Sequence, residues 1–250
     1  MNQEQAKVVF GDWAGILRPY LESPEFEELR TKLRPAENIT YYPDPRDLVF
    51  LPFRLSPLKD LRVIILGEDP YPLPGMSDGL AFSVKADVPR DKFPASIRSL
   101  LAGMENDVLN GEPDTIRDTR NGNLQYLSSQ GVMLLNTALT IRGKNADGTG
   151  EVEKHTDLWA PFTKSVINAV SQFKNKVIIV ALGNKAMEVC KDLDVFRNNC
   201  FYLQAEHPVQ GAKRENEGGL PWQHKNIFTY VNEIIRINEQ GAPINWLPKP

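Results

Sequence analysis

Four short runs of apolar residues stand out along the chain. They are rich in Val, Ile and Leu and show no regular alternation with polar residues, which is typical of strands buried on both faces of a parallel sheet. We therefore expect four parallel strands, at RVIILG (62–67), GVMLLN (131–136), KVIIVALG (176–183) and CFYLQA (200–205).

Segments with helical periodicity separate these runs. The alternation of strands and helices predicts an α/β fold, a three-layer sandwich with a central four-stranded parallel sheet flanked by helices. No repeat or long linker divides the chain, so we expect one domain over residues 1–250. The expected helices lie at about 3–21, 24–33, 94–109, 121–130, 156–173, 184–193 and 221–240.

The composition indicates an ordinary soluble globular protein, with 250 residues, 41% of them hydrophobic, and a net charge of −3. This charge argues against binding to nucleic acid by bulk electrostatics, but it allows a local basic patch. The sequence has neither a secretory signal nor an apolar run of about 18 residues. We therefore expect a cytoplasmic or nuclear monomer without membrane contact, whose two cysteines, Cys190 and Cys200, are reduced core thiols.

Polar residues stand at the carboxyl ends of the expected strands. Glu68 and Asp69 follow the first strand, Asn136 ends the second, Asn184 follows the third and His207 follows the fourth. Ligands of open α/β sheets bind at this edge. A carboxylate, an amide and an imidazole gathered there are typical of an active site.

The GEDPYPLPG segment after the first strand has prolines at alternate positions 70, 72 and 74. Each proline fixes its own φ angle and favours an extended conformation for the residue before it. No helix begins here for Asp69 to cap. We interpret the segment as a stiff loop that holds Asp69 and Tyr71 in fixed orientations.

Other positions are weaker indicators. A strand-end Asn136 is as often a turn residue as a functional one, and a lone His207 carries little weight by itself. GLAFSV is expected to form a further short strand with Phe82 in the core. The segment around Lys213 and Arg214 is typical of a solvated loop, yet it is also the basic patch nearest the expected site. No phosphate-binding or metal-binding motif is present in the sequence.

Taken together and in order, GEDPYP, GLAFSV, FPASI, GVMLLNTALT and EHP resemble the uracil-N-glycosylase family of uracil-DNA glycosylases. The resemblance runs from about residue 50 to 235. It implies hydrolysis of the N-glycosidic bond of uracil flipped out of DNA, which leaves an abasic site and starts base-excision repair. It also implies a monofunctional enzyme that needs no metal or organic cofactor.

The resemblance assigns roles to five residues. Asp69 matches the aspartate that positions the attacking water and favours positive charge on the sugar. His207 matches the histidine that donates to the uracil carbonyl oxygen as the base leaves as an anion. Asn136 matches the asparagine that pairs with the uracil edge and discriminates against cytosine. Tyr71 matches the tyrosine that excludes the thymine methyl group, and Phe82 matches the aromatic ring that stacks on the base.

DNA contacts are implied in two segments. One matches the family's backbone-pinching loop, and the other matches its minor-groove loop, usually His-Pro-Ser-Pro-Leu-Ser. Here the leucine wedge of that loop aligns with a glycine, so we expect a weaker grip on duplex DNA and a preference for single strands. The expected contacts to uracil-containing DNA, single- or double-stranded, are Pro94, Ser96, Pro208, Gln210, Gly211, Lys213 and Arg214.

Two departures from the family pattern lie in the GEDPYPLPG segment. Glu68 stands where the family has glutamine, which adds a charge beside Asp69 that raises a carboxyl pKa or changes the base accepted. Pro72 stands where the family has histidine. Two alternatives follow: a DNA-binding protein on the same fold that serves a polymerase or replication protein, and a glycosylase for a different modified pyrimidine. Binding of a proteinaceous glycosylase inhibitor stays open.

Overall fold

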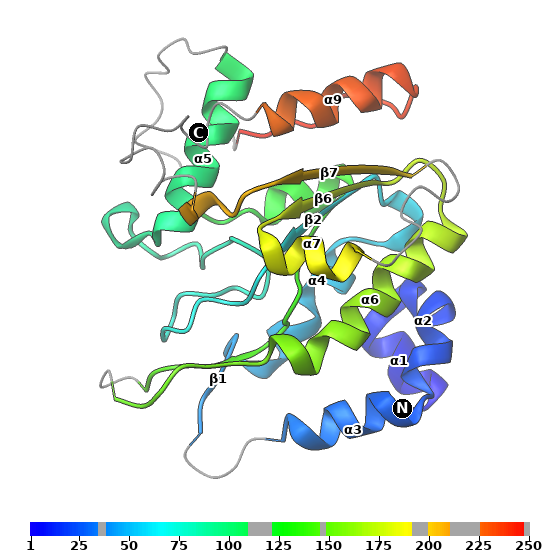
Figure 1. Cartoon of the computed structure of the whole chain (residues 1–250), viewed down its shortest axis with the longest axis vertical. Coiled ribbons are helices and arrows are strands. Elements are labelled where there is room, and N and C mark those ends of the chain that lie inside the picture. Colours follow the sequence, from blue (N-terminus) through cyan, green and yellow to red (C-terminus); the bar gives the residue numbers. More distant parts are fainter. Residues whose placement is uncertain (35–38, 110–121, 146–148, 192–199, 211–225, 248–250) are drawn as a thin grey trace.

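A parallel four-stranded sheet lies at the centre of the computed structural model (Figure 1). Its strands are β2 (Val63–Gly67), β3 (Val132–Asn136), β6 (Ile178–Leu182) and β7 (Phe201–Ala205), in the order β3-β2-β6-β7. All three pairings are parallel, which confirms the expected fold class and all four strands. The structure describes residues 1–34, 39–109, 122–145, 149–191, 200–210 and 226–247.

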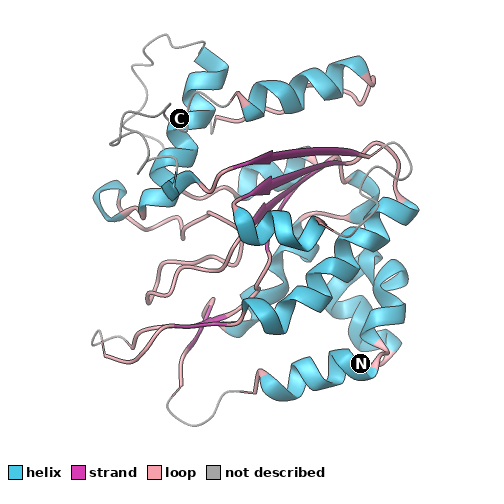
Figure 2. Ribbon diagram, viewed as in Figure 1, coloured by secondary structure: helices cyan, strands magenta, loops and turns pink. Residues whose placement is uncertain are grey.

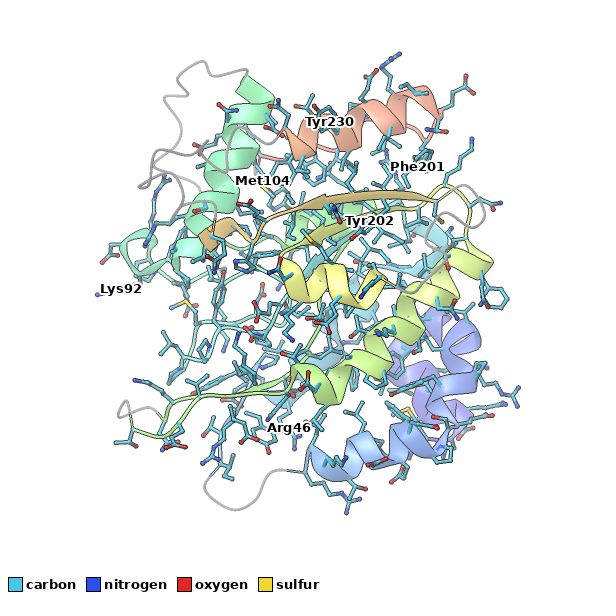
Figure 3. All side chains as sticks on the ribbon, in the orientation of Figure 1. Arg46, Lys92, Met104, Phe201, Tyr202 and Tyr230 are labelled. Atoms are coloured by element: carbon cyan, nitrogen blue, oxygen red, sulfur yellow. The ribbon has the colours of Figure 1, made fainter. Side chains whose placement is uncertain are left out.

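Hydrophobic clusters cover both faces of this sheet and make three layers. Val63 and Ile65 pack on the side of α5 (Ala95–Leu109) and α9 (Ile227–Ile237). Ile64 and Leu66 pack with the amino-terminal helices, α6 (Thr156–Phe173) and α7 (Asn184–Cys190). Figure 1 shows these helices on opposite sides of the sheet. The alternation continues on β7, where neighbouring Phe201 and Tyr202 belong to opposite faces (Figure 3). The continuous apolar runs are therefore explained by burial on two faces.

The helices largely follow the sequence-based expectations. The expected segment 3–21 divides into two α-helices joined by a 3₁₀ turn, and 121–130 contains a 3₁₀ turn rather than an α-helix. The α-helices are α1 (Gln3–Phe10), α2 (Ala14–Leu21), α3 (Pro24–Lys32), α4 (Leu51–Leu55), α5 (Ala95–Leu109), α6 (Thr156–Phe173), α7 (Asn184–Cys190) and α9 (Ile227–Ile237). The 3₁₀ turns are η1 (Gly11–Trp13), η2 (Arg46–Phe50), η3 (Leu58–Asp60), η4 (Arg90–Lys92) and η6 (Gln125–Gln130).

The expected strand at 79–84 is wrong. This segment makes a single antiparallel bridge, between Ser77 and Val84, because Phe82 has a φ of 64°, which interrupts the extended backbone. The buried Asp78 holds the turn from within, since its carboxylate accepts hydrogen bonds from Ser83 Oγ at 2.6 Å and from the Leu80 N–H at 3.1 Å. Polar contacts inside the turn replace the expected ladder.

A second, small antiparallel sheet was not expected (Figure 2). It has the order β1-β4-β5, from β1 (Tyr41–Tyr42), β4 (Ile141–Arg142) and β5 (Glu153–Lys154). Directly after β5, His155 is only 3% exposed, and its Nδ1 lies 2.9 Å from Thr140 Oγ1. Strands β4 and β5 therefore form a hairpin that is fastened at its base by this contact.

Two further observations concern the described residues. Cys190 and Cys200 are free and buried, as expected. No helix in the described ranges is long and apolar enough to cross a membrane.

Candidate active site

The carboxyl ends of the four strands meet at one edge of the sheet. The register pairs Gly67 with Asn136 and Leu182 with Ala205, so the residues that follow these strands come together. A cavity of about 760 Å³ opens at this edge. Its walls are formed by residues from seven segments of the chain, among them Asp69, Tyr71, Phe82, Asn136, Lys154 and His207.

Backbone hydrogen bonds fasten the loop after β2 to its neighbours. The Glu68 carbonyl accepts from Thr137 Oγ1 at 2.8 Å and from the Ala138 N–H at 2.9 Å, both just beyond the end of β3. Further along, the Pro72 carbonyl accepts from the Lys144 N–H of the small hairpin at 3.1 Å. The loop is therefore tied to two other segments, in addition to the stiffness that its prolines provide.

Gly67, the last residue of β2, is in close contact with two residues of the cavity wall. A Cβ atom at this position would lie 2.6 Å from Asn136 Oδ1 and 3.1 Å from Phe82 Cε2. These separations are shorter than van der Waals contact. Glycine is therefore required here because the amide and the aromatic ring occupy the space of a side chain.

Two carboxylates and one lysine form an ion cluster in the cavity wall. Lys154 Nζ lies 2.5 Å from Glu68 Oε1 and 3.2 Å from Asp69 Oδ2. The Asp69 side chain is only 16% exposed, against 29% for Glu68 and 55% for Lys154. The contact to Asp69 is an ion pair only, because the buried Oδ2 makes no hydrogen bond of good geometry within the described part of the chain.

The ion cluster sets opposing influences on the pKa of Asp69. Burial raises this pKa above its usual value, the Lys154 charge lowers it in part, and the Glu68 charge raises it again. For Lys154, burial acts to lower the pKa, but the hydrogen bond to Glu68 and the charges of both carboxylates outweigh burial and raise it. Lys154 is therefore a protonated ammonium group at neutral pH.

Tyr71 connects the loop to the opposite wall. Its Oη lies 2.8 Å from the Phe82 carbonyl and 2.9 Å from Ser96 Oγ. Since a phenol has one proton, it donates to the carbonyl and accepts from the serine hydroxyl. Burial raises the pKa of Tyr71 well above its usual value, so the group stays neutral. The backbone of Phe82, held at its positive φ, is thereby linked to the loop that carries Asp69.

His207 stands in the cavity wall just beyond the end of β7. Its Nδ1 accepts from the Val209 N–H at 3.3 Å, which places the proton of the neutral ring on Nε2. Burial is the main influence on the His207 pKa and lowers it, so the imidazole is neutral at pH 7. Its ring lies 5.6 Å, centroid to centroid, from that of Phe82. The cavity therefore combines a carboxylate, an amide, an aromatic ring and a neutral N–H donor.

The sequence model of the Uracil DNA glycosylase superfamily matches residues 53–231, which hold the whole parallel sheet and every cavity residue described above. The chain belongs to the uracil DNA glycosylase superfamily.

Solved structures of uracil-DNA glycosylases share this fold. That of mimivirus uracil-DNA glycosylase has a TM-score of 0.77 at 20% identity, over 98% of this chain and 89% of that one. The wild-type UNG of Nitratifractor salsuginis has a TM-score of 0.57 at 21% identity, over 99% and 97%. A mimivirus UNG variant in complex with UGI also matches, with a TM-score of 0.77 at 21% identity over 96% and 90%.

The structure brings together most of the site residues expected of a uracil-DNA glycosylase. All six expected catalytic and base-binding residues line the cavity, as do three of the expected DNA contacts: Glu68, Asp69, Tyr71, Phe82, Asn136, His207, Pro94, Ser96 and Gln210. Pro208 is buried and is not part of the cavity wall. Gly211, Lys213 and Arg214 lie outside the described residues.

Lys154 is the one member of the ion cluster that is not among the sequence-based expectations for this uracil-DNA glycosylase superfamily member. It lies in a polar stretch of mixed charge, where Arg142 and Lys144 are equally plausible partners for a carboxylate. One signal was available: Glu68, next to Asp69 at a buried strand end, calls for a compensating cation. Only the pairing of β5 with β4 shows which cation supplies it.

Proposed function

We propose that this protein hydrolyses the N-glycosidic bond of uracil in DNA, releases the free base and leaves an abasic site that enters base-excision repair. The observation that carries this proposal is the convergence of Asp69, Asn136 and His207, which come from three different strand ends, on one cavity beside Phe82. Superfamily membership supports the same reaction class. The base has to leave the DNA stack to reach such a cavity.

In this proposal, Asp69 acts on the sugar side of the bond. As the C1′–N1 bond breaks, its electron pair leaves with the base and C1′ becomes positively charged, as in other glycoside cleavages. An ionised Asp69 stabilises this charge and orients a water molecule. The water oxygen then bonds to C1′, and its proton passes to Asp69 and on to solvent.

His207 and Asn136 act on the base. The Nε2–H of neutral His207 donates to the uracil carbonyl oxygen on which negative charge develops, and a fixed donor favours the transition state over the ground state. The buried Asn136 amide reads the edge of the pyrimidine, so a base that presents the wrong donors leaves polar groups unpaired. The Phe82 ring provides a stacking surface, and Tyr71, anchored by its hydroxyl, limits the space for a 5-methyl group.

We infer a monofunctional enzyme, with water as nucleophile and no strand cleavage. A lyase step needs an amine that is unprotonated, so that it can attack C1′. Lys154 is the amine nearest Asp69 in the described cavity wall, and its two ion pairs keep it protonated. Strand breaks at the lesion without alkali would overturn this part of the proposal.

The test uses labelled oligonucleotides with one uracil, single- and double-stranded, beside thymine and cytosine controls. Abasic products are revealed by alkali. Asp69→Asn and His207→Ala run in parallel, with Glu4→Gln, an exposed carboxylate of α1, as the matched control. We expect uracil-specific cleavage that falls by about 10² to 10⁴ in each site variant and is unchanged in the control.

Retained DNA binding without cleavage by folded wild-type protein would overturn the enzymatic proposal in favour of a binding protein. Cleavage only of another modified pyrimidine would retain the reaction class and replace the substrate. Faster cleavage of duplex than of single-stranded uracil would contradict the expected single-strand preference.

A further inference from the structure

Contacts within the small hairpin help to fix the position of Lys154, in addition to those that the hairpin makes with the Asp69 loop. Residue 154 pairs with Ile141 in the small antiparallel sheet, and the next residue, His155, is buried at the base of the hairpin. Thr140 Oγ1 accepts from Trp159 Nε1 at 2.8 Å and shares a second hydrogen bond of 2.9 Å with His155 Nδ1. The hairpin thus delivers an ammonium group to the carboxylates from outside the parallel sheet.

The charges at the cavity edge compensate each other. Glu68 and Asp69 are adjacent in sequence, and the ammonium group lies within 3.2 Å of both. The Glu68–Lys154 pair has no net charge, so one carboxylate charge, that of Asp69, is left over. The other titratable groups in the described cavity wall are Tyr71, Lys185, Glu206 and His207, and no ion pair joins any of these four to Asp69 there.

We propose that Glu68 and Lys154 form one functional unit, in which Lys154 is a positioning residue that neutralises Glu68 and leaves Asp69 as the single net carboxylate of the ion cluster. This inference rests on the proposed function and deepens it. It explains how an acidic residue is compatible with a neighbouring carboxylate that has to be ionised to stabilise a cationic sugar. The effects of the two residues then depend on each other. Removing only one of the two charges changes the electrostatic field at Asp69, whereas keeping both or removing both leaves that field similar.

A different role for Lys154 makes a different prediction. If the ammonium group bound a DNA phosphate, its loss would weaken DNA affinity whatever residue stood at position 68. If it compensates Glu68, its loss is corrected by removing the Glu68 charge. Four proteins therefore separate the two roles: wild type, Lys154→Met, Glu68→Gln, and the variant with both changes.

The measurement is the single-turnover cleavage rate as a function of pH on a single-stranded uracil oligonucleotide. Loss of the ammonium group raises the Asp69 pKa, so we expect Lys154→Met to move the acid limb upward by about one pH unit. Glu68→Gln removes a negative charge and moves the limb downward. The double variant returns to within about half a unit of wild type, and Lys154→Arg, which keeps the charge, stays there as well.

The same order is expected in the absence of DNA. The carboxyl ¹³C resonance of Asp69, titrated by NMR in each folded protein, reports its ionisation without any turnover. The expected order of Asp69 pKa values is highest in Lys154→Met, intermediate in wild type and the double variant, and lowest in Glu68→Gln. Thermal unfolding of each variant identifies any protein that has failed to fold, and Lys154→Arg then provides the comparison.

The outcomes separate the two proposals. If no variant cleaves uracil but the NMR order holds, the proposed function fails while the charge compensation stands. If wild type cleaves uracil but the double variant behaves as Lys154→Met does, Glu68 and Lys154 do not act as a unit and this inference is overturned. Equal losses of DNA affinity in both proteins that lack Lys154, with unmoved pH profiles, would assign the lysine to phosphate binding instead.

Discussion

The two sides of the cavity are held in different ways. The loop that carries Asp69 is cross-linked to distant segments: Thr137 donates to the Glu68 carbonyl, and Tyr71 bonds both the Phe82 carbonyl and Ser96. In its described part, the loop that carries His207 is held by local hydrogen bonds, since the Val209 N–H donates to the imidazole and the Gln210 N–H donates to the His207 carbonyl. One side is a network of side chains, and the other is a local turn.

Packing against glycine is what the two sides have in common. Gly67 lets Asn136 and Phe82 approach the end of β2, and Gly183 lets His207 approach the end of β6. A disturbance on the first side therefore spreads through a network, whereas one on the second side is confined to a single ring. We expect a substitution on the network side to reduce the rate, the base discrimination and the stability together. A substitution on the His207 side should reduce the rate and leave the base discrimination intact.

The largest effect is expected from Gly67→Ala, which attacks the network side. The new methyl group would lie 2.6 Å from Asn136 Oδ1, so the amide and the Phe82 ring both have to move. We expect a loss of about 10² in the single-turnover rate, weaker discrimination against cytosine, and a free energy of unfolding lower by about 1 to 3 kcal/mol. The measurements are single-turnover kinetics on uracil and cytosine oligonucleotides and urea unfolding.

Gly15→Ala is the matched control, because a Cβ there meets nothing within 4 Å and Gly15 lies in α2. Its rate should equal that of wild type, and its stability should be the same or higher. A Gly67→Ala protein with normal rate and base discrimination would show that the close approach does not constrain the site.

The second effect is expected from Gly183→Ala, which attacks the His207 side. A methyl group would lie 2.9 Å from His207 Cβ, at a residue whose φ is +100°. We expect about a tenfold loss of rate, because the Nε2 donor moves relative to the base, with discrimination between uracil and cytosine retained. Single-turnover kinetics on both oligonucleotides measures this.

Gly241→Ala separates the effect of backbone strain from the effect of the steric contact with His207. Gly241 has a φ of +90° but nothing within 4 Å of its Cβ position, so it shares the strain without the clash. It should lose stability, by about 1 to 3 kcal/mol, and keep its rate. If Gly183→Ala lost discrimination as severely as Gly67→Ala does, the distinction between the two sides would be wrong.

The same distinction explains how far the sequence could predict the molecule. The strands were predictable because burial on two faces demands continuous apolar runs, and α6 was predicted with both its bounds, 156–173. Asp69, Asn136 and His207 were predictable as neighbours because parallel strands bring their carboxyl ends to one edge. These are consequences of local pattern and topology.

The network itself was not predictable in that way. GLAFSV has the composition of a strand, yet tertiary contacts override it: the Asp78 carboxylate accepts from the distant Asn123 Nδ2 at 3.0 Å, and Phe82 takes a positive φ. Lys154 could not be singled out, because its role depends on a two-residue strand pairing that leaves no periodic signal. Cross-links between distant segments are what a reading of local pattern misses.

A smaller effect is expected from Tyr71→Phe, which removes one cross-link and keeps the ring. The Phe82 carbonyl and Ser96 each lose a hydrogen-bond partner, so we expect about 1 kcal/mol less stability and a rate loss of about threefold. The retained ring should still exclude thymine. Urea unfolding and cleavage of uracil and thymine oligonucleotides measure these. Tyr230→Phe, at an exposed position of α9, is the control and should change neither quantity.

The smallest effect is expected from a change of pH near neutrality. It bears on both sides of the cavity, because Asp69 on one side and His207 on the other are titratable. Asp69 has to be ionised, and burial raises its pKa, so activity is lost as pH falls at a higher pH than for an ordinary carboxyl group. His207 has to be neutral, and burial lowers its pKa, so it stays neutral below the usual histidine range. Between about pH 7 and 8 the wild-type rate should vary by less than about twofold, with one acid limb below that range. The acid limb belongs to Asp69 if it moves in Glu68→Gln and is retained in His207→Gln; a limb that vanishes with His207 would place the titrating group on the other side.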